Sequence, residues 1–514
     1  MEYQRLSEDD SDNDDLAESA AAGLTTHKRL QRSILIRLYT SHFLSYWNSR
    51  AFEFGAVLFL AGIFPGTLLY ASIYALGRSL AGTLLSSRVG SYVDRTNRLT
   101  AIRSSIIWQR FPVAASCGLF LVLFAGPQSR LTFWLCFPTT VLLACFEKLA
   151  AMGNTIALER DWIIVVADAV TVPRQSLNGT LRRIDLCCKL LAPLVLAFVE
   201  GLSTTLAIWI VFGTTAVSVL VEYLAIAQVY SSIPELAHKD CTPQSSSDDP
   251  EATATMAVEP HQSRHKTVSL QFSSVLRPWK QYFDSPAFLA SFSLSLLYLT
   301  VLSTSVHWQT YMLSLQFSGM SVAILRLAAV ACELSATVLA PLLMKRIGPI
   351  RSGLWSINWQ LAWLALAIAI FLSLPDSTKM AGAGLTGGIV MSRLGLWGLD
   401  LSVQFIVQES VSEESRGIFS ACEMGLQNLF ELVSFVMTIV WADPALFRVP
   451  AIVSFGAVAI SAGCFAGFVR KERGHLIHMN RCLGSGKGNY RTVGREDSAL
   501  LGGLAREEEG DEHG

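Results

Sequence analysis

The sequence predicts an all-α membrane protein with about 12 transmembrane helices in two bundles of six. Hydrophobic residues make up 51% of the 514-residue chain and charged residues only 16%, a balance typical of a chain embedded in lipid. The hydrophobic residues gather in stretches of about 20, such as 204–223 and 354–374. A polar stretch near the middle of the chain separates these stretches into two groups of similar length.

The expected spans follow the apolar windows that lie between charged, glycine or proline residues. In chain order they are 34–62, 68–91, 100–125, 132–157, 181–200, 204–229, 286–310, 320–344, 350–374, 380–407, 417–442 and 448–469. They define an N-terminal bundle (34–230) and a C-terminal bundle (281–469). The polar segments are predicted to be a disordered N-terminal tail (1–33), a linker (231–280) and a C-terminal tail (470–514), all cytosolic.

Basic residues are distributed unevenly across this topology. The predicted outer loops hold only Arg130, Lys379 and Arg448. The predicted inner segments hold Lys28, Arg29, Arg32, Arg37, Arg95, Arg98, Arg160, Arg174, Lys345, Arg346, Arg351, Arg470, Lys471 and Arg473. The positive-inside rule therefore predicts that both termini are cytosolic. We expect a monomer in the plasma membrane, with a vacuolar or other organelle membrane as the alternative.

Composition and motifs exclude several functions. A net charge of -1 argues against a nucleic-acid binder, which needs a concentrated basic face. The sequence has no phosphate-cradling loop and no nucleophile elbow, so we expect neither an ATP-driven pump nor an enzyme, and no cofactor. The ten cysteines are scattered without a CxxC spacing, which is typical of small buried hydrophobic residues.

A charged motif, Gly90-x-x-x-Asp94-Arg95-x-x-Arg98, lies between the second and third expected spans. It resembles the loop signature of the major facilitator superfamily. There the glycine permits close helix packing, and the acid and bases form a latch between neighbouring helices. The resemblance implies a major-facilitator fold, with Asp94, Arg95 and Arg98 as gating residues.

Polar residues inside the first span are functional candidates, because ionisable groups are costly in a membrane. Ser49 and Glu53 are four residues apart and share a helix face, so their oxygens would converge on one cation, beside Asn48. The alternative is that Glu53 pairs with Arg50 or with a base on another helix.

Other spans carry further candidate metal ligands. Gln109 and Glu222 supply oxygen donors on the third and sixth spans. His307, near the end of the seventh span, is either a ligand or a hydrogen-bonding group at the membrane interface. Glu431 ends a polar stripe, begun by Glu423 and Gln427, that would line a transport pathway with or without a metal.

Several strings resemble the ferroportin family over about residues 35–470. They are Ser41-His42-Phe43-Leu44-Ser45-x-Trp47-x-x-Arg50, Glu159-Arg160-Asp161-Trp162-Ile163-Ile164-Val165-Val166, Asn178-x-Thr180-x-Arg182-Arg183-Ile184-Asp185, Leu297-Tyr298-x-Thr300-Val301-Leu302, Ser392-Arg393-x-Gly395-Leu396-Trp397-x-x-Asp400 and Glu414-x-Arg416-Gly417.

The resemblance implies export of ferrous iron by alternating access, with a role in iron homeostasis, and extends to Mn²⁺, Co²⁺ or Ca²⁺. It also implies one metal site in each bundle. Where animal members have their metal ligands, this chain has Ser49 and Glu53 in the first half, and Val306 and Ser434 in the second. We therefore expect the dominant site in the first half.

The resemblance also implies that charged residues at the cytosolic helix ends act as gates. These are Asp161, Arg182, Arg183 and Asp185. The alternative is that the bases only anchor the topology. Two other functions stay open at this point. One is a facilitator for an organic solute or drug, and the other is a membrane receptor or sensor that transports nothing.

Overall fold

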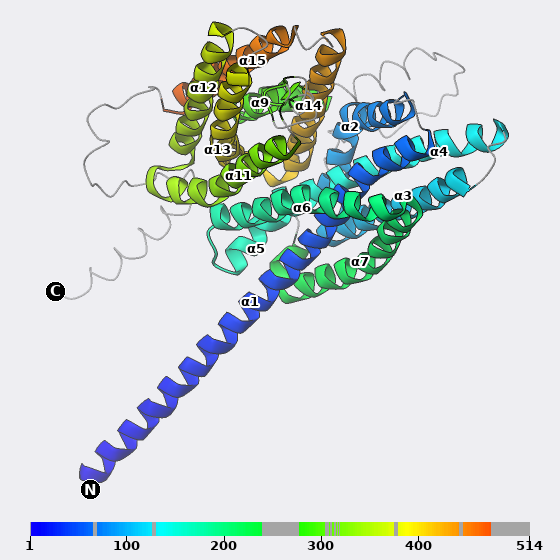
Figure 1. The fold of residues 1–514 in the computed structure, drawn as a ribbon. Helices are drawn as coiled ribbons and strands as arrows, with labels where there is room; N and C mark the ends of the chain where they lie inside the picture. The colour runs from blue at the N-terminus through cyan, green and yellow to red at the C-terminus, as the bar shows by residue number, and fades with distance from the viewer. Residues whose placement is uncertain are drawn as a thin grey trace, which may run out of the picture. The chain divides into compact units, whose positions relative to one another are not determined.

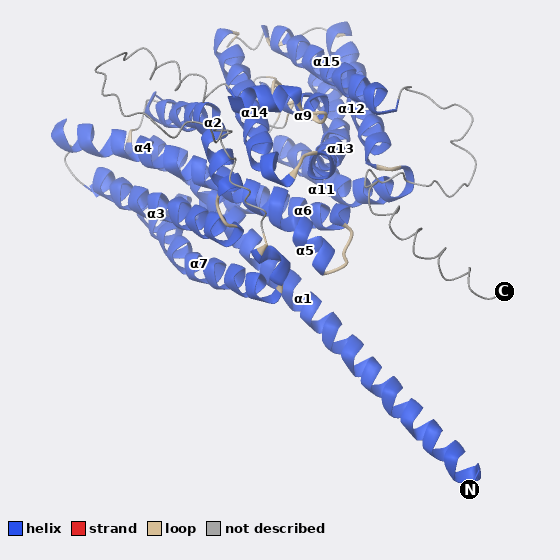
Figure 2. Cartoon of the chain, turned by 180° about the vertical axis from the view of Figure 1, so that it is seen from behind, coloured by secondary structure: helices blue, strands red, loops and turns tan. Residues whose placement is uncertain are grey.

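The computed structural model describes residues 2–64, 69–125, 130–238, 277–303, 308, 311–312, 315, 317, 319–374, 379–441 and 446–473. The secondary structure within these ranges is helical (Figure 2). Residues 1–469 form one compact unit. Most of the predicted linker (239–276), and the predicted C-terminal tail from residue 474 on, lie outside the described residues.

The helices follow the predicted order (Figure 1). The N-terminal half contains α1 (Glu2–Ile63), α2 (Leu69–Arg95), α3 (Arg98–Ala125), α4 (Arg130–Thr155), the π-helix η1 (Ile156–Trp162), α5 (Ile163–Ala169), α6 (Arg174–Leu202), α7 (Thr204–Ser232) and the 3₁₀ helix η2 (Pro234–Ala237). The C-terminal half contains α9 (Phe288–Leu296), α11 (Gly319–Ile347), α12 (Pro349–Ser373), α13 (Lys379–Ser410), α14 (Glu413–Val440) and α15 (Arg448–Arg473). Most bounds lie within a few residues of the predicted spans.

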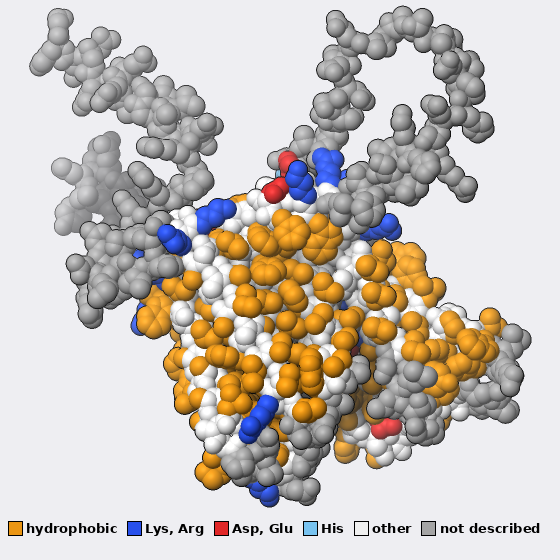
Figure 3. Space-filling model, turned by 90° about the horizontal axis from the view of Figure 1, so that it is seen from above, with side chains coloured by type: hydrophobic (Ala, Val, Ile, Leu, Met, Phe, Trp, Pro, Cys, Tyr) orange, Lys and Arg blue, Asp and Glu red, His pale blue; other side chains and the backbone are white. Residues whose placement is uncertain are grey.

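The outer surface of these helices is apolar. Figure 3 shows a face covered largely by hydrophobic side chains, with Lys and Arg toward its edges. Large hydrophobic side chains that are more than half exposed include Leu84, Phe111, Trp134, Phe198, Leu202 and Trp355. Seven helices of the described residues are long and apolar enough to cross a membrane. Lipid is the solvent that such a surface requires, so the predicted multi-pass membrane fold is confirmed.

The two halves meet along two helix pairs, α2 with α14 and α6 with α11. Glycines allow both contacts. A Cβ atom on Gly90 of α2 would lie 2.5 Å from the carbonyl oxygen of Gly417 on α14. A Cβ atom on Gly179 of α6 would lie 2.7 Å from the carbonyl oxygen of Thr337 on α11. Small residues are the usual means by which membrane helices approach closely.

The beginning of the chain differs from the predicted disordered tail. Residues 2–33 continue the first helix, which runs without interruption to Ile63. The physical reason is that no proline occurs before Pro65, so nothing removes a backbone donor or blocks the helix before that residue. The buried part of α1 begins near Ile34, where the first expected span starts.

The connection between the fourth and fifth spans is also shorter than predicted. The fourth helical run continues through η1 and α5 to Ala169, and α6 begins at Arg174 rather than at residue 181. All seven residues of η1 are buried. Residues predicted at helix ends, including Asp161 and Arg182, therefore lie inside helices and face packed neighbours.

The seventh span is not the continuous helix predicted for 286–310. α9 ends at Leu296, and residues 297–303 form turns and irregular backbone. Side chains from three helices replace the lost helical hydrogen bonds: Ser454 accepts from Val301 N–H, Ser434 donates to Thr300 O, and Arg393 donates to Leu302 O. Irregular backbone at membrane depth is tolerated where protein satisfies it in this way.

The tight packing of α12 on α13 gives a test of the fold. A Cβ atom on Gly395 would lie 2.8 Å from the backbone nitrogen of Gln360, whereas one on Gly387 of the same helix would meet nothing within 4 Å. We expect Gly395→Ala to destabilise the protein by about 1–3 kcal/mol through overpacking. Gly387→Ala should be neutral or stabilising by up to about 1 kcal/mol, the helix-propensity gain.

Thermal unfolding of the purified protein in detergent measures both changes. Equal shifts in Tm for the two variants would show that α12 and α13 do not pack as described.

Candidate functional site

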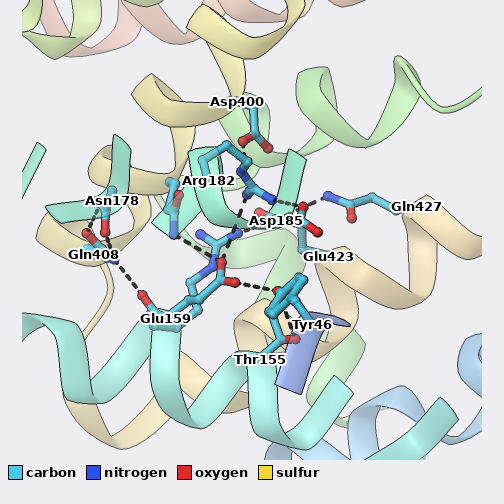
Figure 4. Close-up of polar contacts among 12 residues, drawn as sticks. Tyr46, Thr155, Glu159, Asn178, Arg182, Asp185, Asp400, Gln408, Glu423 and Gln427 are labelled. Carbon is cyan, nitrogen blue, oxygen red and sulfur yellow. Dashed lines mark hydrogen bonds and ion pairs between the residues drawn. The ribbon is translucent and has the colours of Figure 1, made fainter. Parts of the chain in front are cut away.

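Arg182 of α6 is the centre of a polar network between the halves (Figure 4). Its guanidinium lies 2.9 Å from the carboxylate of Asp400, which α13 contributes from the other half. On its own side it lies 3.4 Å from Asp185 and 4.0 Å from Glu159. The guanidinium attracts all three carboxylates in a region that water reaches poorly, and Arg50 supplies a second base to Asp185. Of these contacts, the one with Asp400 joins the two halves.

Glu159 in the π-helix connects further residues to this network. Its carboxylate accepts hydrogen bonds from the Tyr46 hydroxyl at 2.5 Å and from Gln404 at 3.4 Å. Its backbone carbonyl accepts a bond from Gln408 at 2.7 Å, and Gln408 also pairs with Asn178. π-helices occur often at functional sites. Here Glu159 of the π-helix contacts the C-terminal half through its carboxylate, which bonds to Gln404, and through its carbonyl, which bonds to Gln408.

Two residues of the Gly90-to-Arg98 motif, Asp94 and Arg98, contact α14 of the other half. The carboxylate of Asp94 accepts hydrogen bonds from the backbone N–H groups of Gly417 and Ile418 on α14, both at 2.7 Å. Arg98 is buried, bonds to Asp161 at 3.1 Å and pairs with Glu413 of α14. The motif therefore ties the N-terminal half to the first turns of α14.

Two more ion pairs cross between the halves near this motif. Arg160 of η1 lies 2.7 Å from Glu423 of α14, whose carboxylate is fully buried and also accepts a hydrogen bond from Ser291. Arg174, at the start of α6, lies 3.3 Å from Glu409 at the end of α13. We call the pairs Arg182–Asp400, Arg98–Glu413, Arg160–Glu423 and Arg174–Glu409 the inter-half latch.

Not all predicted gating residues join this latch. Asp185 pairs with Arg50 at 2.9 Å, within the N-terminal half. Arg183 bonds to Gly179 and Thr180 of its own helix. Arg95 is exposed and forms no hydrogen bond or ion pair within the described residues. A gating role stays a prediction for all of the predicted residues, inside the latch and outside it.

The candidate ligands of the first span do not converge on one point. Glu53 lies between two bases, 3.2 Å from Arg50 and 3.6 Å from Arg78. The hydroxyl of Ser49 instead accepts a hydrogen bond from Gln109 at 2.5 Å. The shared helix face suggested a common cation, but a helix face does not reveal which bases other helices bring to it. The structure thus agrees with the alternative, in which Glu53 is an ion-pair partner.

Asn48 and Glu222 are also held by other side chains. Asn48 donates to Ser218 at 2.9 Å, while its side-chain oxygen has no partner. Glu222 is fully buried and binds Arg110 through both oxygens, at 2.7 and 3.0 Å. One guanidinium nitrogen, Nη2 of Arg110, donates to both carboxylate oxygens, so a base occupies the carboxylate where a cation was expected.

The described residues contain no group of three or more His, Cys, Asp or Glu side chains that could hold a metal. His307 and Val306 lie outside these residues. Ser434, at the second-half position, donates to Thr300 O in the irregular segment after α9. Glu431 faces a cavity and, in the part of the chain that the structure describes, has no ion-pair partner.

This central cavity has a volume of about 510 Å³. It lies between α1 and α6 of the first half and α9, the irregular segment after it, α11, α13 and α14 of the second. Its walls are formed by Phe54, Leu186, Lys189, Leu190, Leu294, Leu297, Tyr298, Thr300, Ser303, Arg326, Val330, Glu333, Arg393, Leu396, Trp397, Asp400, Glu431, Ser434 and Phe435. Asp400 belongs to both the cavity wall and the inter-half latch, so the two features are directly coupled.

Sequence reasoning missed several residues of these networks. Arg78, which pairs with Glu147 at 2.8 Å, and Arg110 are single bases inside apolar spans. That position alone was a signal, because an intramembrane base needs a partner. Arg393 and Asp400 were visible as motif residues, but nothing in the sequence indicates which helix faces them.

Comparison with known proteins places this chain in a family. A family model described as Ferroportin1 matches residues 32–458. Solute carrier family 40 member 1 of Oryza sativa subsp. japonica is 30% identical over 469 residues, covering 88% of this chain and 94% of that protein. The alignment therefore includes both halves and the inter-half latch.

Two solved structures share the fold. A bacterial homologue of the iron transporter ferroportin in an outward-facing state has a TM-score of 0.71 at 22% identity, covering 85% of this chain and 99% of that one. The inward-facing structure of such a homologue has a TM-score of 0.54 at 21% identity, covering 85% and 98%. On the family match and the relative of 30% identity, the chain belongs to the ferroportin family.

Proposed function

We propose that the chain exports ferrous iron across a membrane by alternating access. The observation that carries this proposal is the inter-half latch beside a central cavity. The latch joins the halves through ion pairs, which break and re-form more readily than a continuous apolar interface when two rigid halves move. The family also includes homologues solved in outward-facing and inward-facing states, one of them with soaked iron.

Two accessible acids support a cation substrate: Glu431 in the cavity wall, and Glu53, which lies outside that wall. Glu431 has no ion-pair partner among the described residues, and the side chain of Glu53 is 45% exposed although it is paired. We assign the metal pathway to Glu431, with Glu53 as a second contact that its arginines release. Glu222 is less suited to bind a metal ion, because Arg110 donates hydrogen bonds to both of its carboxylate oxygens. Oxygen donors of this kind suit Fe²⁺ and also Mn²⁺, Co²⁺ and Ca²⁺.

Iron efflux tests the function directly. Cells loaded with radioactive iron should lose it faster when they express this protein than with an empty vector. Glu431→Gln keeps the shape of the side chain but removes its charge, so it should slow efflux about tenfold, the effect of about 1.4 kcal/mol. Glu235→Gln, on the exposed η2 segment, is the matched control. Equal efflux from vector and wild-type cells would reject an iron exporter.

We infer from the basic-residue asymmetry that both termini and the 231–280 linker are cytosolic. We further propose the plasma membrane as the site of export. The inter-half latch then lies toward the cytosol, and the structure corresponds to an outward-facing state. An epitope inserted within 239–276 should resist protease added to intact cells and be cleaved after permeabilisation. Cleavage in intact cells would reverse the topology.

Asp400→Asn tests the latch without leaving an unpaired base. Arg182 keeps Asp185 and Glu159 in its own half, so folding should be preserved while the tie to α13 is lost. A change of about 1.4 kcal/mol between the two states alters their ratio about tenfold, and efflux at matched abundance should fall by a similar factor. The control is Glu200→Gln, which changes a carboxylate that bonds to Thr204 inside one half and touches no member of the latch. Equal efflux from the two variants would exclude Asp400 as a gate.

A further inference from the structure

Glu53 of α1 is the middle of a row of five alternating charges inside the N-terminal half. On one side, Arg50 lies 3.2 Å from Glu53 and 2.9 Å from Asp185 of α6. On the other side, Arg78 of α2 lies 3.6 Å from Glu53 and 2.8 Å from Glu147 of α4. Each arginine is therefore shared between Glu53 and one outer acid. We call these five residues the charge row, with Asp185 and Glu147 as its outer acids.

The outer acids hold the arginines more closely than Glu53 does. The side chains of Asp185 and Glu147 are 4% and 1% exposed, whereas that of Glu53 is 45% exposed. Each arginine also lies nearer to its outer acid than to Glu53. A charge pair is strongest where little water screens it. Each guanidinium therefore pairs mainly with its outer acid, and Glu53 is the link of the row that exchanges most readily.

This arrangement determines how strongly Glu53 can attract a cation. A cation that binds its exposed carboxylate competes with Arg50 and Arg78, and like charges at such distances repel each other. The repulsion is smaller while the outer acids neutralise the two arginines from the far side. Without Glu147, the guanidinium of Arg78 would have Glu53 as its remaining ion-pair partner among the described residues. The affinity of Glu53 for a cation then depends on an acid that the cation does not touch.

Two lysines also surround Glu53. The charges of Lys148 on α4 and Lys189 on α6 act on its carboxylate, but neither lysine forms an ion pair with it in the part of the chain that the structure describes. They make the surroundings of Glu53 more positive, so that the outer acids matter more for any cation contact. Both lysines are unchanged in every variant considered below, and differences between the variants therefore do not depend on them.

We propose that Glu147 is a positioning residue for metal binding, because it neutralises Arg78 and thereby raises the affinity of Glu53 for a divalent cation. Asp185 does the same through Arg50, but it also lies 3.4 Å from Arg182 of the inter-half latch. Glu147 has no such second ion pair among the described residues, which makes it the better test. The inference rests on the proposed metal export and deepens it by naming what sets the strength of one metal contact.

Isothermal titration of the purified full chain with Co²⁺ in detergent tests the inference. Glu147→Gln keeps the shape of the side chain but turns Arg78 toward Glu53, so Co²⁺ should bind about tenfold more weakly. Adding Arg78→Gln should reverse this loss and raise the affinity above that of wild type, because Glu53 then faces one arginine instead of two. The control is Glu200→Gln, which changes a carboxylate that bonds to Thr204 and should leave the affinity unchanged.

Glu53→Gln shows whether the effect passes through Glu53. In that background Glu147→Gln should cause no further loss, because the carboxylate on which it acts is gone. An equal loss with and without Glu53 would overturn the inference. Unchanged Co²⁺ affinity in Glu147→Gln, or in Glu53→Gln alone, would overturn it as well. If Glu53→Gln leaves no measurable binding, the reversal by Arg78→Gln decides.

Tm measurements separate a folding effect from a binding effect. Removing one partner of a buried ion pair is strongly destabilising, whereas removing both partners leaves no unpaired charge. If Glu147→Gln fails to fold, the double variant Arg78→Gln/Glu147→Gln takes its place and should bind Co²⁺ more tightly than wild type. Affinity of the double variant at or below that of wild type would overturn the inference, because the pair would then have a structural role only.

Iron efflux from cells distinguishes this inference from the proposed function. Efflux by the wild type, together with unchanged Co²⁺ affinity in Glu147→Gln, would reject the positioning role and leave metal export intact. Loss of affinity in Glu147→Gln and its reversal by Arg78→Gln, without iron efflux from wild-type cells, would support the positioning role and reject the exporter.

Discussion

The constraint on which the rest of this structure depends is that charges inside a membrane protein must be neutralised. Arg182 shows the consequence, because it sits among Asp400, Asp185 and Glu159 rather than near water. Where such partners lie in different halves, neutralisation also joins the halves. The ion pairs that neutralise these buried charges are therefore also the contacts that must separate when the halves move.

The irregular segment after α9 is the second feature with a mechanical role. Its backbone groups are bonded by Arg393, Ser434 and Ser454, which belong to three different helices. Side chains hold this segment where helical hydrogen bonds would hold an ordinary span. The three helices are thus in direct contact with the cavity wall, since Thr300 and Ser303 line the cavity. Broken helices beside central sites are a general feature of transporters.

The sequence predicted the bounds of most helices well, but it predicted poorly which side chains of different helices contact one another. Hydropathy places α2, α3 and α7 within a few residues because each must present an apolar surface to lipid, a property of the helix alone. The convergence of Ser49 and Glu53 on one cation failed for the opposite reason. It depended on Arg50, Arg78 and Gln109, and the last two come from other helices. The break after Leu296 was missed because the residues that satisfy it lie more than 90 positions away along the chain.

By itself, the sequence determined that this chain is helical, lies in a membrane and carries its apolar spans in two groups, since these properties follow from local hydropathy and charge. It also determined the family, through strings of neighbouring residues. Only the tertiary structure decided that Glu222 is sealed by Arg110, that Arg182 reaches Asp400, and that Glu53 shares its two arginines with Asp185 and Glu147. The physical reason is that the charge state of a buried group depends on what surrounds it in space, and helices distant in sequence supply those surroundings.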